Sequence, residues 1–364
     1  MKISELIKAL ELLAPPDLQE EYDNAGWIVG QEDQETAGCL VCLDVTEEVM
    51  DEAVSKNCRL VISHHPLIFE PLRRITGKTM TEKIVIKAIK QGIAIYSVHT
   101  NLDNVIHGVN EMLGSKLGLT ELKILNRKRG ALKKLVTFCP EDHAGNVRDA
   151  IFQAGAGQIG EYDQCSFNAK GLGTFRGGDA TNPFVGKKGE VHFEPEIRME
   201  TIFPAWLEKP VVEALLDAHP YEEVAYDIYP LDNLYDKAGA GMIGELPAEM
   251  PLEEFLQMLK EVLRISYLRH SQPTGKKVRR VAICGGSGSF LIPEAIRQQA
   301  DVFVSADIKY HAFQETVGKL VIIDAGHFET EQFTCDLIAG YLIEKFPNFA
   351  VIISENLINP VNYF

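Results

Sequence analysis

The sequence predicts an α/β protein in which two similar α/β halves form one discontinuous body, interrupted by an inserted ferredoxin-like α+β domain. Short apolar runs alternate with amphipathic stretches near both ends of the chain, which is typical of parallel sheets covered by helices. The pattern changes in the middle of the chain, and 364 residues exceed the usual length of one domain. We expect the first half at 1–130, the insert at 131–233 and the second half at 234–364.

Continuous apolar runs at 38–43, 59–63 and 93–98 predict the strands of the first half. Runs of this kind are typical of parallel strands that are buried on both faces. An amphipathic stretch at 46–56 separates the first two runs and predicts a connecting helix. Similar runs predict the strands of the second half, at 280–284, 302–305, 320–324 and 350–353.

The insert has a different order of predicted elements, strand, helix, two strands, helix and strand. This β-α-β-β-α-β order is that of the split-βαβ, ferredoxin-like unit. In chain order the predicted elements lie at 134–138, 142–153, 160–171, 190–203, 206–218 and 223–229. The insert carries no catalytic constellation, so regulation, oligomerisation or control of access are the roles that we expect for it.

Composition excludes several classes of protein. The formal net charge of −16 makes nucleic acid an unfavourable partner, because phosphate backbones are repelled by an acidic surface. No run approaches the roughly 18–20 apolar residues that span a bilayer, so no membrane partner is expected. The seven scattered cysteines are not a disulfide framework. With no secretory signal evident, these features favour the cytoplasm.

Two adjacent histidines, His64 and His65, directly follow the predicted strand at 59–63. Ligands in open α/β sheets gather beyond the carboxyl ends of the strands, and adjacent side chains there can face two different metal ions. A single histidine at this place is more often structural. The pair, after an otherwise apolar strand, favours metal binding.

A histidine and a carboxylate with three residues between them follow one strand in each half, as His99 with Asp103 and His327 with Glu331. Side chains four positions apart lie on the same face of a helical turn, so each half presents one nitrogen and oxygen pair at the same place. The competing interpretation of each pair is a helix start with an exposed acid. Glu329 is a further carboxylate, but its spacing places it away from the face of His327.

These residues together supply three neutral nitrogens and two carboxylates, which suits Zn, Mn, Fe or Co rather than Ca or Mg. One structural zinc needs fewer ligands, so we predict two divalent ions, with zinc favoured, roughly 3.5–4 Å apart; such a pair activates water. His99 is either a sixth ligand or a catalytic group that orients the water, and the second role is favoured. The predicted metal ligands are His64, His65, Asp103, His327 and Glu331.

Further candidates follow the strands of the second half. The glycine-rich turn at 285–290 is either an anion site in which Gly286 and Gly288 bind substrate phosphate or a tight strand-to-helix turn. Asp307 and Lys309 follow the next strand and are candidates for substrate binding, with a structural salt bridge as the alternative for the lysine. His311 is a candidate for proton transfer.

The sequence resembles the Nif-three-like dinuclear-metal family, whose members are called GTP cyclohydrolase 1 type 2 homologues. The likeness covers nearly all of the chain and is carried by the motifs at 22–26, 43–46, 63–66, 99–103, 306–311 and 326–331. It implies that the five predicted ligands hold a metal pair within a ring-shaped homohexamer. It also implies that the insert is the PII-like or CutA-like domain of the longer bacterial members, and that the activity is opening of the GTP ring.

The residues support two functions from different classes. The first is a metal-dependent hydrolase that acts on a nucleotide-like or phosphorylated small molecule, although no sequence feature identifies a pocket for a particular base. The second is a metal-binding regulatory or metal-trafficking protein without turnover. An enzyme needs a proton-transfer group such as His99 or His311, whereas a carrier does not.

Overall fold

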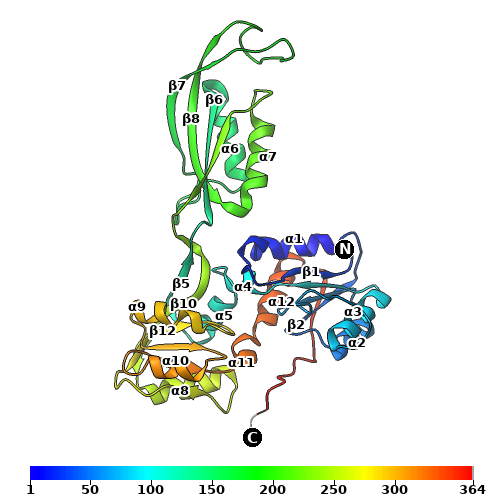
Figure 1. Ribbon diagram of the computed structural model, residues 1–364, viewed down its shortest axis with the longest axis vertical. Helices are drawn as coiled ribbons and strands as arrows, with labels where there is room; N and C mark the ends of the chain where they lie inside the picture. The colour runs from blue at the N-terminus through cyan, green and yellow to red at the C-terminus, as the bar shows by residue number, and fades with distance from the viewer. Residues whose placement is uncertain (363–364) are drawn as a thin grey trace. The chain divides into compact units, whose positions relative to one another are not determined.

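The computed structural model describes residues 1–362, and the chain divides into two compact units. The split unit consists of Met1–Arg127 and Lys237–Phe364, and the inserted unit is Lys128–Asp236. The predicted limits of the insert were 131 and 233. Each unit has its own sheets, helices and core (Figure 1).

The first half of the split unit is built on a five-stranded sheet. Its order is β1-β4-β3-β2-β15, with every neighbouring pair parallel except β1 with β4. Because the parallel strands run in one direction, their carboxyl ends share one edge of the sheet. The strands are β1 (Gly26–Val29), β2 (Gly38–Cys42), β3 (Leu60–Ser63), β4 (Ala94–Ser97) and β15 (Ala350–Ile353). The prediction that the strand at 350–353 belongs to the second half was wrong, because β15 pairs with β2.

Helices cover both faces of this sheet, which explains why its strands are apolar throughout. Leu6 of α1 and Ile338 of α12 pack on one face, and Val49 of α2 and Ile84 of α3 pack on the other. The hydroxyl of Thr46 accepts a hydrogen bond from the backbone at the start of α2, as an N-cap residue should. The helices are α1 (Ile3–Leu13), α2 (Glu47–Ser55), α3 (Met80–Gln91) and α12 (Thr334–Lys345).

The second half has a six-stranded mixed sheet with the order β11-β14-β13-β12-β10-β5. Its parallel core, β12, β13 and β14, repeats the arrangement of β2, β3 and β4. Helices α5 and α8 contribute to the core on one face, and α9 contributes on the other. The elements are β5 (Thr120–Lys128), β10 (Tyr235–Met250), β11 (Arg269–His270), β12 (Val278–Ile283), β13 (Val302–Ser305), β14 (Val321–Asp324), α5 (Val109–Lys116), α8 (Leu252–Leu263), α9 (Ile292–Arg297) and α10 (Tyr310–Glu315).

Two very short helices complete the split unit. Helix α4 (Thr100–Asp103) follows β4, and α11 (His327–Glu331) follows β14. They occupy equivalent places in the two halves, as the repeated spacing of histidine and carboxylate predicted. Within the described residues, 3-10 turns link other elements of the split unit at Pro16–Leu18 and Ser289–Leu291, and of the inserted unit at Glu141–His143 and Ala205–Leu207.

The inserted unit is an antiparallel four-stranded sheet with the order β7-β8-β6-β9. Helices α6 and α7 lie together on one face of this sheet (Figure 1). Their side chains pack on alternate residues of the strands. The element order is the β-α-β-β-α-β order predicted from the sequence. The elements are β6 (Leu132–Pro140), α6 (Ala144–Gln153), β7 (Phe167–Phe175), β8 (His192–Pro204), α7 (Glu208–Ala218) and β9 (Tyr226–Leu231).

The prediction for the second strand of the insert was wrong in its position, because 160–171 was expected and β7 is Phe167–Phe175. Gly157 and Gly160 have positive φ angles of 84° and 57°, which turn the chain before the strand begins. An isolated bridge between Ile159 and Tyr162 then closes a tight turn.

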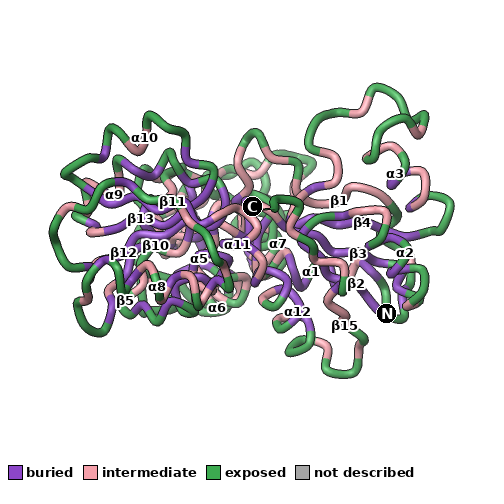
Figure 2. Tube along the Cα trace, turned by 90° about the horizontal axis from the view of Figure 1, so that it is seen from below, coloured by how far each residue is buried: buried purple, intermediate pink, exposed green. Residues whose placement is uncertain are grey.

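The central strands of the split unit are its most buried segments. Figure 2 shows β2, β3, β4 and β13 in the colour of buried residues, with exposed segments in the connections around them. Residues of β10 and β12 such as Met242 and Val281 belong to one core, and those of β2 and β3 such as Val41 and Ile62 belong to another. Across residues 1–362, every helix is too short or too polar to cross a membrane.

Candidate metal centre

His64 and His65 leave β3 in ordered positions. The ladder between β2 and β3 continues past the strand, because His64 N donates to Cys42 O and His65 N donates to Leu43 O. The ring of His64 is fully buried, and its Nδ1 lies 2.8 Å from Val98 O. His65 Nδ1 lies 2.8 Å from Asp44 Oδ1. In each ring Nδ1 is occupied by these contacts, so Nε2 is the nitrogen that could bind a metal ion.

His99 and His327 are oriented in the same way, each by a carboxylate. His99 Nδ1 lies 2.7 Å from Asp23 Oδ1, and His327 Nδ1 lies 2.7 Å from Asp307 Oδ2. Histidines that bind metals commonly engage a carboxylate or a carbonyl through the other ring nitrogen, which fixes the tautomer and the ring orientation. All four imidazoles therefore have the supporting contacts that are typical of metal ligands.

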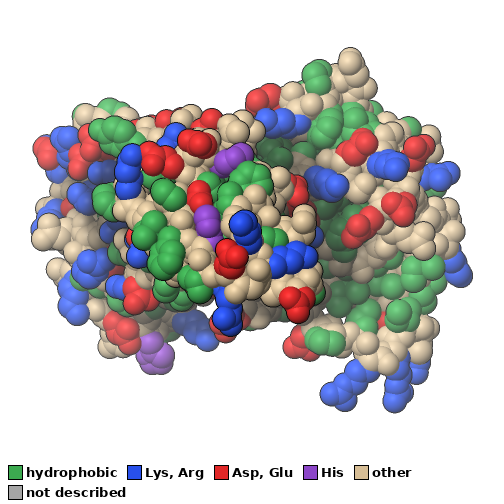
Figure 3. Space-filling model, turned by 90° about the horizontal axis from the view of Figure 1, so that it is seen from above, with side chains coloured by type: hydrophobic (Ala, Val, Ile, Leu, Met, Phe, Trp, Pro, Cys, Tyr) green, Lys and Arg blue, Asp and Glu red, His purple; other side chains and the backbone are tan. Residues whose placement is uncertain are grey.

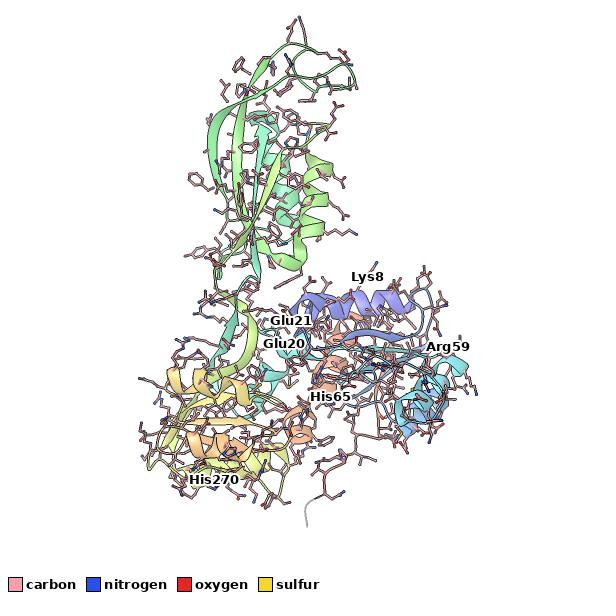
Figure 4. The ribbon with its side chains drawn as sticks, viewed as in Figure 1. Lys8, Glu20, Glu21, Arg59, His65 and His270 are labelled. Atoms are coloured by element: carbon pink, nitrogen blue, oxygen red, sulfur yellow. The ribbon has the colours of Figure 1, made fainter. Side chains whose placement is uncertain are left out.

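The two predicted carboxylates lie among these rings. Glu331 Oε2 is 3.0 Å from both His65 Nε2 and His327 Nε2, and the contact with His327 spans one turn of α11. Glu331 Oε1 is 3.8 Å from His64 Nε2, and Asp103 Oδ1 is 3.7 Å from the same nitrogen. In Figure 4, His65 lies in the interior of the split unit, between the elements of its two halves.

Burial and neighbouring charges shift the protonation of this cluster. Burial raises the pKa of Asp103, and the nearby Glu331 carboxylate raises it further. Burial opposes ionisation of Glu331 too, but hydrogen bonds from His327 and its neighbours hold the pKa of Glu331 below its usual range. For His65, burial is outweighed by hydrogen bonds to Asp44 and Glu331, which raise its pKa to about 10. The negative charge of the carboxylates and the positive charge of the protonated imidazoles thus stabilise one another in the cluster.

Several features fit a bound divalent cation. His64 Nε2 and Asp103 Oδ1 are buried and have no hydrogen-bond partner among the described residues, an arrangement that is costly unless another ligand satisfies them. Gly286 leaves room for the cluster, because a Cβ there would lie 2.2 Å from Glu331 Oε1. The potential ligand atoms form groups within 4.8 Å: His64, His65 and His99; His65, His327 and Glu331; and His64, Asp103 and Glu331.

All five residues predicted as metal ligands are therefore brought together, and His99 joins them. The ring centroid of His99 lies 5.3 Å from that of His64 and 5.5 Å from that of His65. The cluster draws its side chains from both halves of the split unit. The alternative interpretation of exposed acids at helix starts does not hold for Glu331, which is 3% exposed.

The glycine-rich turn differs from the predicted phosphate site. Gly286 N donates to Thr330 Oγ1 at 3.0 Å, and Gly288 N donates to Ser305 Oγ at 2.9 Å. Gly288 is also buried, and a Cβ there would lie 2.5 Å from that of Cys284. Because both amides already bind side chains, the geometry favours the alternative interpretation of a tight strand-to-helix turn. The turn packs β12 against the cluster.

The remaining second-half candidates have different places. Asp307 contacts His327 and Ser287, so it orients a histidine of the cluster. Lys309 and His311 are exposed at the start of α10, and neither lines the cavities at the cluster in the described part of the chain. The ring of His311 lies beside that of Tyr310, with centroids 5.5 Å apart. The structure thus gives no support to substrate binding by Lys309 or to proton transfer by His311.

Asp23 and Asp44 lie in the motifs at 22–26 and 43–46 that carry the family resemblance, but sequence reasoning assigned neither of them a contact in the cluster. Asp44 follows β2 as His65 follows β3, so its position after a buried strand was an available signal. Asp23 lies in the segment before β1, far from His99 in sequence, and also accepts a hydrogen bond from Thr100 N at 3.1 Å. That contact depends on the tertiary fold.

Two cavities adjoin the cluster within the split unit. The donor cavity has a volume of about 380 Å³ and is lined by potential ligands and aromatic rings, among them His65, His99, Asp103, Glu331, Tyr22, Phe69 and Phe290. The rear cavity has a volume of about 440 Å³ and reaches His65 and His327 from the side of Asp44 and Asp307. Substrate-sized space therefore lies directly beside the potential metal ligands.

Comparison with known proteins places the chain in a family. A protein of Halalkalibacterium halodurans is 40% identical over 324 residues, which cover 88% of this chain and 87% of that protein. One of Bacillus subtilis is 36% identical over 365 residues, 99% of this chain and 98% of that protein. Both are named "GTP cyclohydrolase 1 type 2 homolog".

The fold agrees with these relationships. The crystal structure of a Bacillus cereus protein related to NIF3 matches with a TM-score of 0.88 and 38% identity, covering 100% of this chain and 99% of that chain. The model of the family described as Duf34/NIF3 (NGG1p interacting factor 3) matches residues 1–360. Sequence, fold and the histidine and carboxylate cluster thus lead to one conclusion: the chain belongs to the Duf34/NIF3 family.

Proposed function

We propose that this protein is a hydrolase that depends on two divalent metal ions per chain and acts on a nucleotide-like or phosphorylated small molecule. The observation that carries the proposal is that four of the five predicted ligands, all except the buried His64, line the donor cavity. A purely structural metal site is closed, whereas a catalytic one keeps an open position for water or substrate. Zinc is the favoured ion, and Mn, Fe or Co would also suit the nitrogen and oxygen donors.

The five predicted ligands, His64, His65, Asp103, His327 and Glu331, would hold the ions. When bound, such ions activate water and stabilise negative charge that develops on the substrate. Asp44 and Asp307 would fix the rings of His65 and His327 through their Nδ1 atoms, at 2.8 and 2.7 Å. The protein thereby supplies a rigid set of donors.

His99 is the residue that we assign to proton transfer. Its Nδ1 is held by Asp23, so its Nε2 is the free ring nitrogen, and the residue lines the donor cavity. A histidine oriented by a carboxylate can accept a proton from an attacking water and return it to a leaving group. The Asp23 carboxylate would stabilise the imidazolium that forms in between.

The walls of the donor cavity suit a flat substrate. Tyr22, Phe69 and Phe290 are exposed aromatic residues that line it, and the ring centroids of Tyr22 and Phe69 are 6.5 Å apart. Aromatic faces stack favourably on planar heterocycles such as nucleobases. The names of the relatives fit the same class of substrate, and GTP is therefore the first compound to test.

The assembly and location that we propose are a homohexamer in the cytoplasm. Large exposed apolar residues in the inserted unit, including Phe167, Leu172 and Phe193, support association with further copies. A nucleic acid is not the partner that we propose, because the net charge is −16 and acidic side chains are interspersed with basic ones on the face in Figure 3. Light scattering of the untagged protein measures the assembly directly.

The test of the hydrolase combines metal analysis with turnover. We expect two ions per chain in untagged protein, and release of product from a panel of nucleotides and phosphoesters that begins with GTP. His65→Ala should remove at least one ion, whereas His270→Ala, at the outer side of the split unit in Figure 4, should remove none. His99→Gln should abolish turnover and retain both ions.

The outcomes separate the two functions. Full metal content without turnover of any compound in the panel would refute the hydrolase and leave the metal-binding regulator or carrier. Unchanged metal content in His65→Ala would refute the ligand set itself. Loss of an ion in His99→Gln would make His99 a ligand and remove the role in proton transfer.

A further inference from the structure

The inserted unit contains a cavity that the proposed metal chemistry does not use. Its volume is about 610 Å³, within the usual range of roughly 300–1,000 Å³ for pockets that bind small molecules. The lining comes only from the inserted unit: parts of β6, β7 and β8, the loop between β7 and β8, and the segment before β9. We call it the insert cavity.

A buried carboxylate, Glu196 of β8, forms part of the wall. Ile197 and Met199 of the same strand pack toward the helices. Because successive side chains of a strand point to opposite faces, Glu196 points to the face of the sheet away from the helices. Glu196 is only 9% exposed, because the residues around the cavity cover it.

The space for this carboxylate is built into the strand beside it. A Cβ at Gly173 of β7 would lie 2.0 Å from Glu196 Oε2, so only glycine leaves room for the carboxylate in its observed position. On the other side, the Tyr221 hydroxyl donates to Glu196 Oε1 at 2.9 Å. Tyr221 is itself held by its backbone N, which donates to His219 Nδ1 at 3.1 Å. One oxygen is thereby fixed, and within residues 1–362 the other oxygen has no hydrogen-bond donor.

Two of the basic residues near Glu196 have acidic partners, whereas Glu196 itself has no basic partner in the described part of the chain. Three basic residues line the cavity. Lys170 pairs with Glu141 and Arg198 pairs with Glu200, both outside the lining, and the third, Arg176, is exposed. Within the described residues, Glu196 has no basic group within 4.0 Å, and its single partner is the neutral hydroxyl of Tyr221. A buried carboxylate without a cation is costly, so the cavity has a place for a positive charge.

Aromatic rings surround the same place. The ring centroid of Tyr221 lies 6.0 Å from that of Phe175 and 6.3 Å from that of Phe184, and all three residues line the insert cavity. Aromatic faces attract organic cations through their quadrupoles and also bury apolar surface. Aromatic rings together with a buried carboxylate are the chemistry that recognises amines.

We propose that the insert cavity binds a small organic cation, an amine or amidine with a flat or aliphatic body, whose charged group contacts Glu196 and whose body lies against Phe175, Phe184 and Tyr221. This site is separate from the potential metal ligands and does not depend on the proposed hydrolysis. It gives the inserted unit a ligand of its own.

The test uses 2-phenylethylamine, which is positively charged at neutral pH, and its uncharged analogue 2-phenylethanol. Saturation-transfer NMR and calorimetry with the full-length protein should show binding of the amine and much weaker binding of the alcohol. Glu196→Gln keeps an acceptor for Tyr221 and removes the charge, so it should weaken amine binding about tenfold or more. Gly173→Ala should weaken it as well, since the added methyl group displaces the carboxylate.

Glu223→Gln is the matched control, because Glu223 lines the same cavity but is exposed. It removes one negative charge and should change the amine affinity by less than about twofold. Equal binding of amine and alcohol, equal effects of the two glutamine variants, or no binding of the amine at millimolar concentration would each refute the proposal. A change of assembly in Glu196→Gln with no amine binding to the parent protein would instead show that a second copy of this chain covers the cavity, and would refute it too.

Discussion

Glu331 Oε2 lies 3.0 Å from His65 Nε2, although the two residues are 266 positions apart in the chain. His65 leaves a strand of the first half and Glu331 ends a short helix of the second, so this contact joins the halves of the split unit. The carboxylate is 3% exposed and also contacts His327. Substitutions in this region should therefore affect both metal binding and stability.

Glu331→Gln should remove metal and the stabilisation that metal provides. The amide lacks the charge that faces His65 and His327, so we expect at most one ion per chain by mass spectrometry. A metal present at about a thousandfold its dissociation constant stabilises the folded state by about 4 kcal/mol, and this gain in thermal stability should be lost. Glu329→Gln is the control, since Glu329 lies on the same helix but accepts a hydrogen bond from the Asn359 side chain. Retention of both ions in Glu331→Gln would contradict the prediction.

Asp44→Asn should weaken metal binding without removing a ligand. Asp44 holds His65 through Nδ1, and loss of such an orienting carboxylate typically lowers metal affinity about 10- to 100-fold. Competition with a chelator of known affinity measures the change. Asp51→Asn breaks only the exposed pair with Lys87 and should leave the affinity unchanged. Equal affinities in the two variants would show that Asp44 has no such role.

Gly286→Ala should destabilise the split unit and displace Glu331. Gly286 has a φ of +59° and Gly318 a φ of +76°, so alanine adds about 1–2 kcal/mol of backbone strain at either position. A Cβ at Gly318 meets nothing within 4 Å, whereas one at Gly286 would lie 2.2 Å from Glu331 Oε1. Urea unfolding and metal analysis should show a larger loss of stability and loss of metal in Gly286→Ala alone. Matching results for the two alanines would mean that Gly286 makes no room for the cluster.

The stability of the inserted unit should fall in mild acid because of His219. Burial lowers the pKa of His219, its hydrogen bond to Phe138 O partly offsets this, and His143 lowers it further. The folded state therefore binds fewer protons than the unfolded state, so the stabilisation is complete above pH of about 6.5 and declines as pH falls below that value toward the folded pKa.

Denaturant unfolding from pH 8 to pH 5 measures this effect. Trp206 lies in the inserted unit, so its fluorescence in a Trp27→Phe background reports that unit alone. His219→Gln cannot titrate, and we expect its stability to vary less with pH than that of the parent. An identical dependence on pH in both proteins would exclude His219 as the source.

The sequence predicted those parts of the site that depend on local order. His327 and Glu331 meet because they are four positions apart on a helical turn, and His64 follows a continuous apolar strand, so both could be placed without a structure. The pairing of Asp23 with His99 could not, because it depends on how the segment before β1 returns to the end of β4. The same limit applies to Gly288, whose amide donates to the Ser305 hydroxyl of the next strand, a contact that the sequence alone did not indicate.

The position of the inserted unit has a consequence for folding. Its first and last strands, β6 and β9, pair with each other, with Leu132 opposite Leu231. The strands that lead into and out of it, β5 and β10, are neighbours in the six-stranded sheet. Closing a flexible loop of about 100 residues costs roughly 4 kcal/mol of chain entropy. If the inserted unit folds first, that cost is met before the two halves of the split unit come together. The inserted unit then connects two neighbouring strands as a hairpin turn does, and its folding helps to bring His65 and Glu331 into contact.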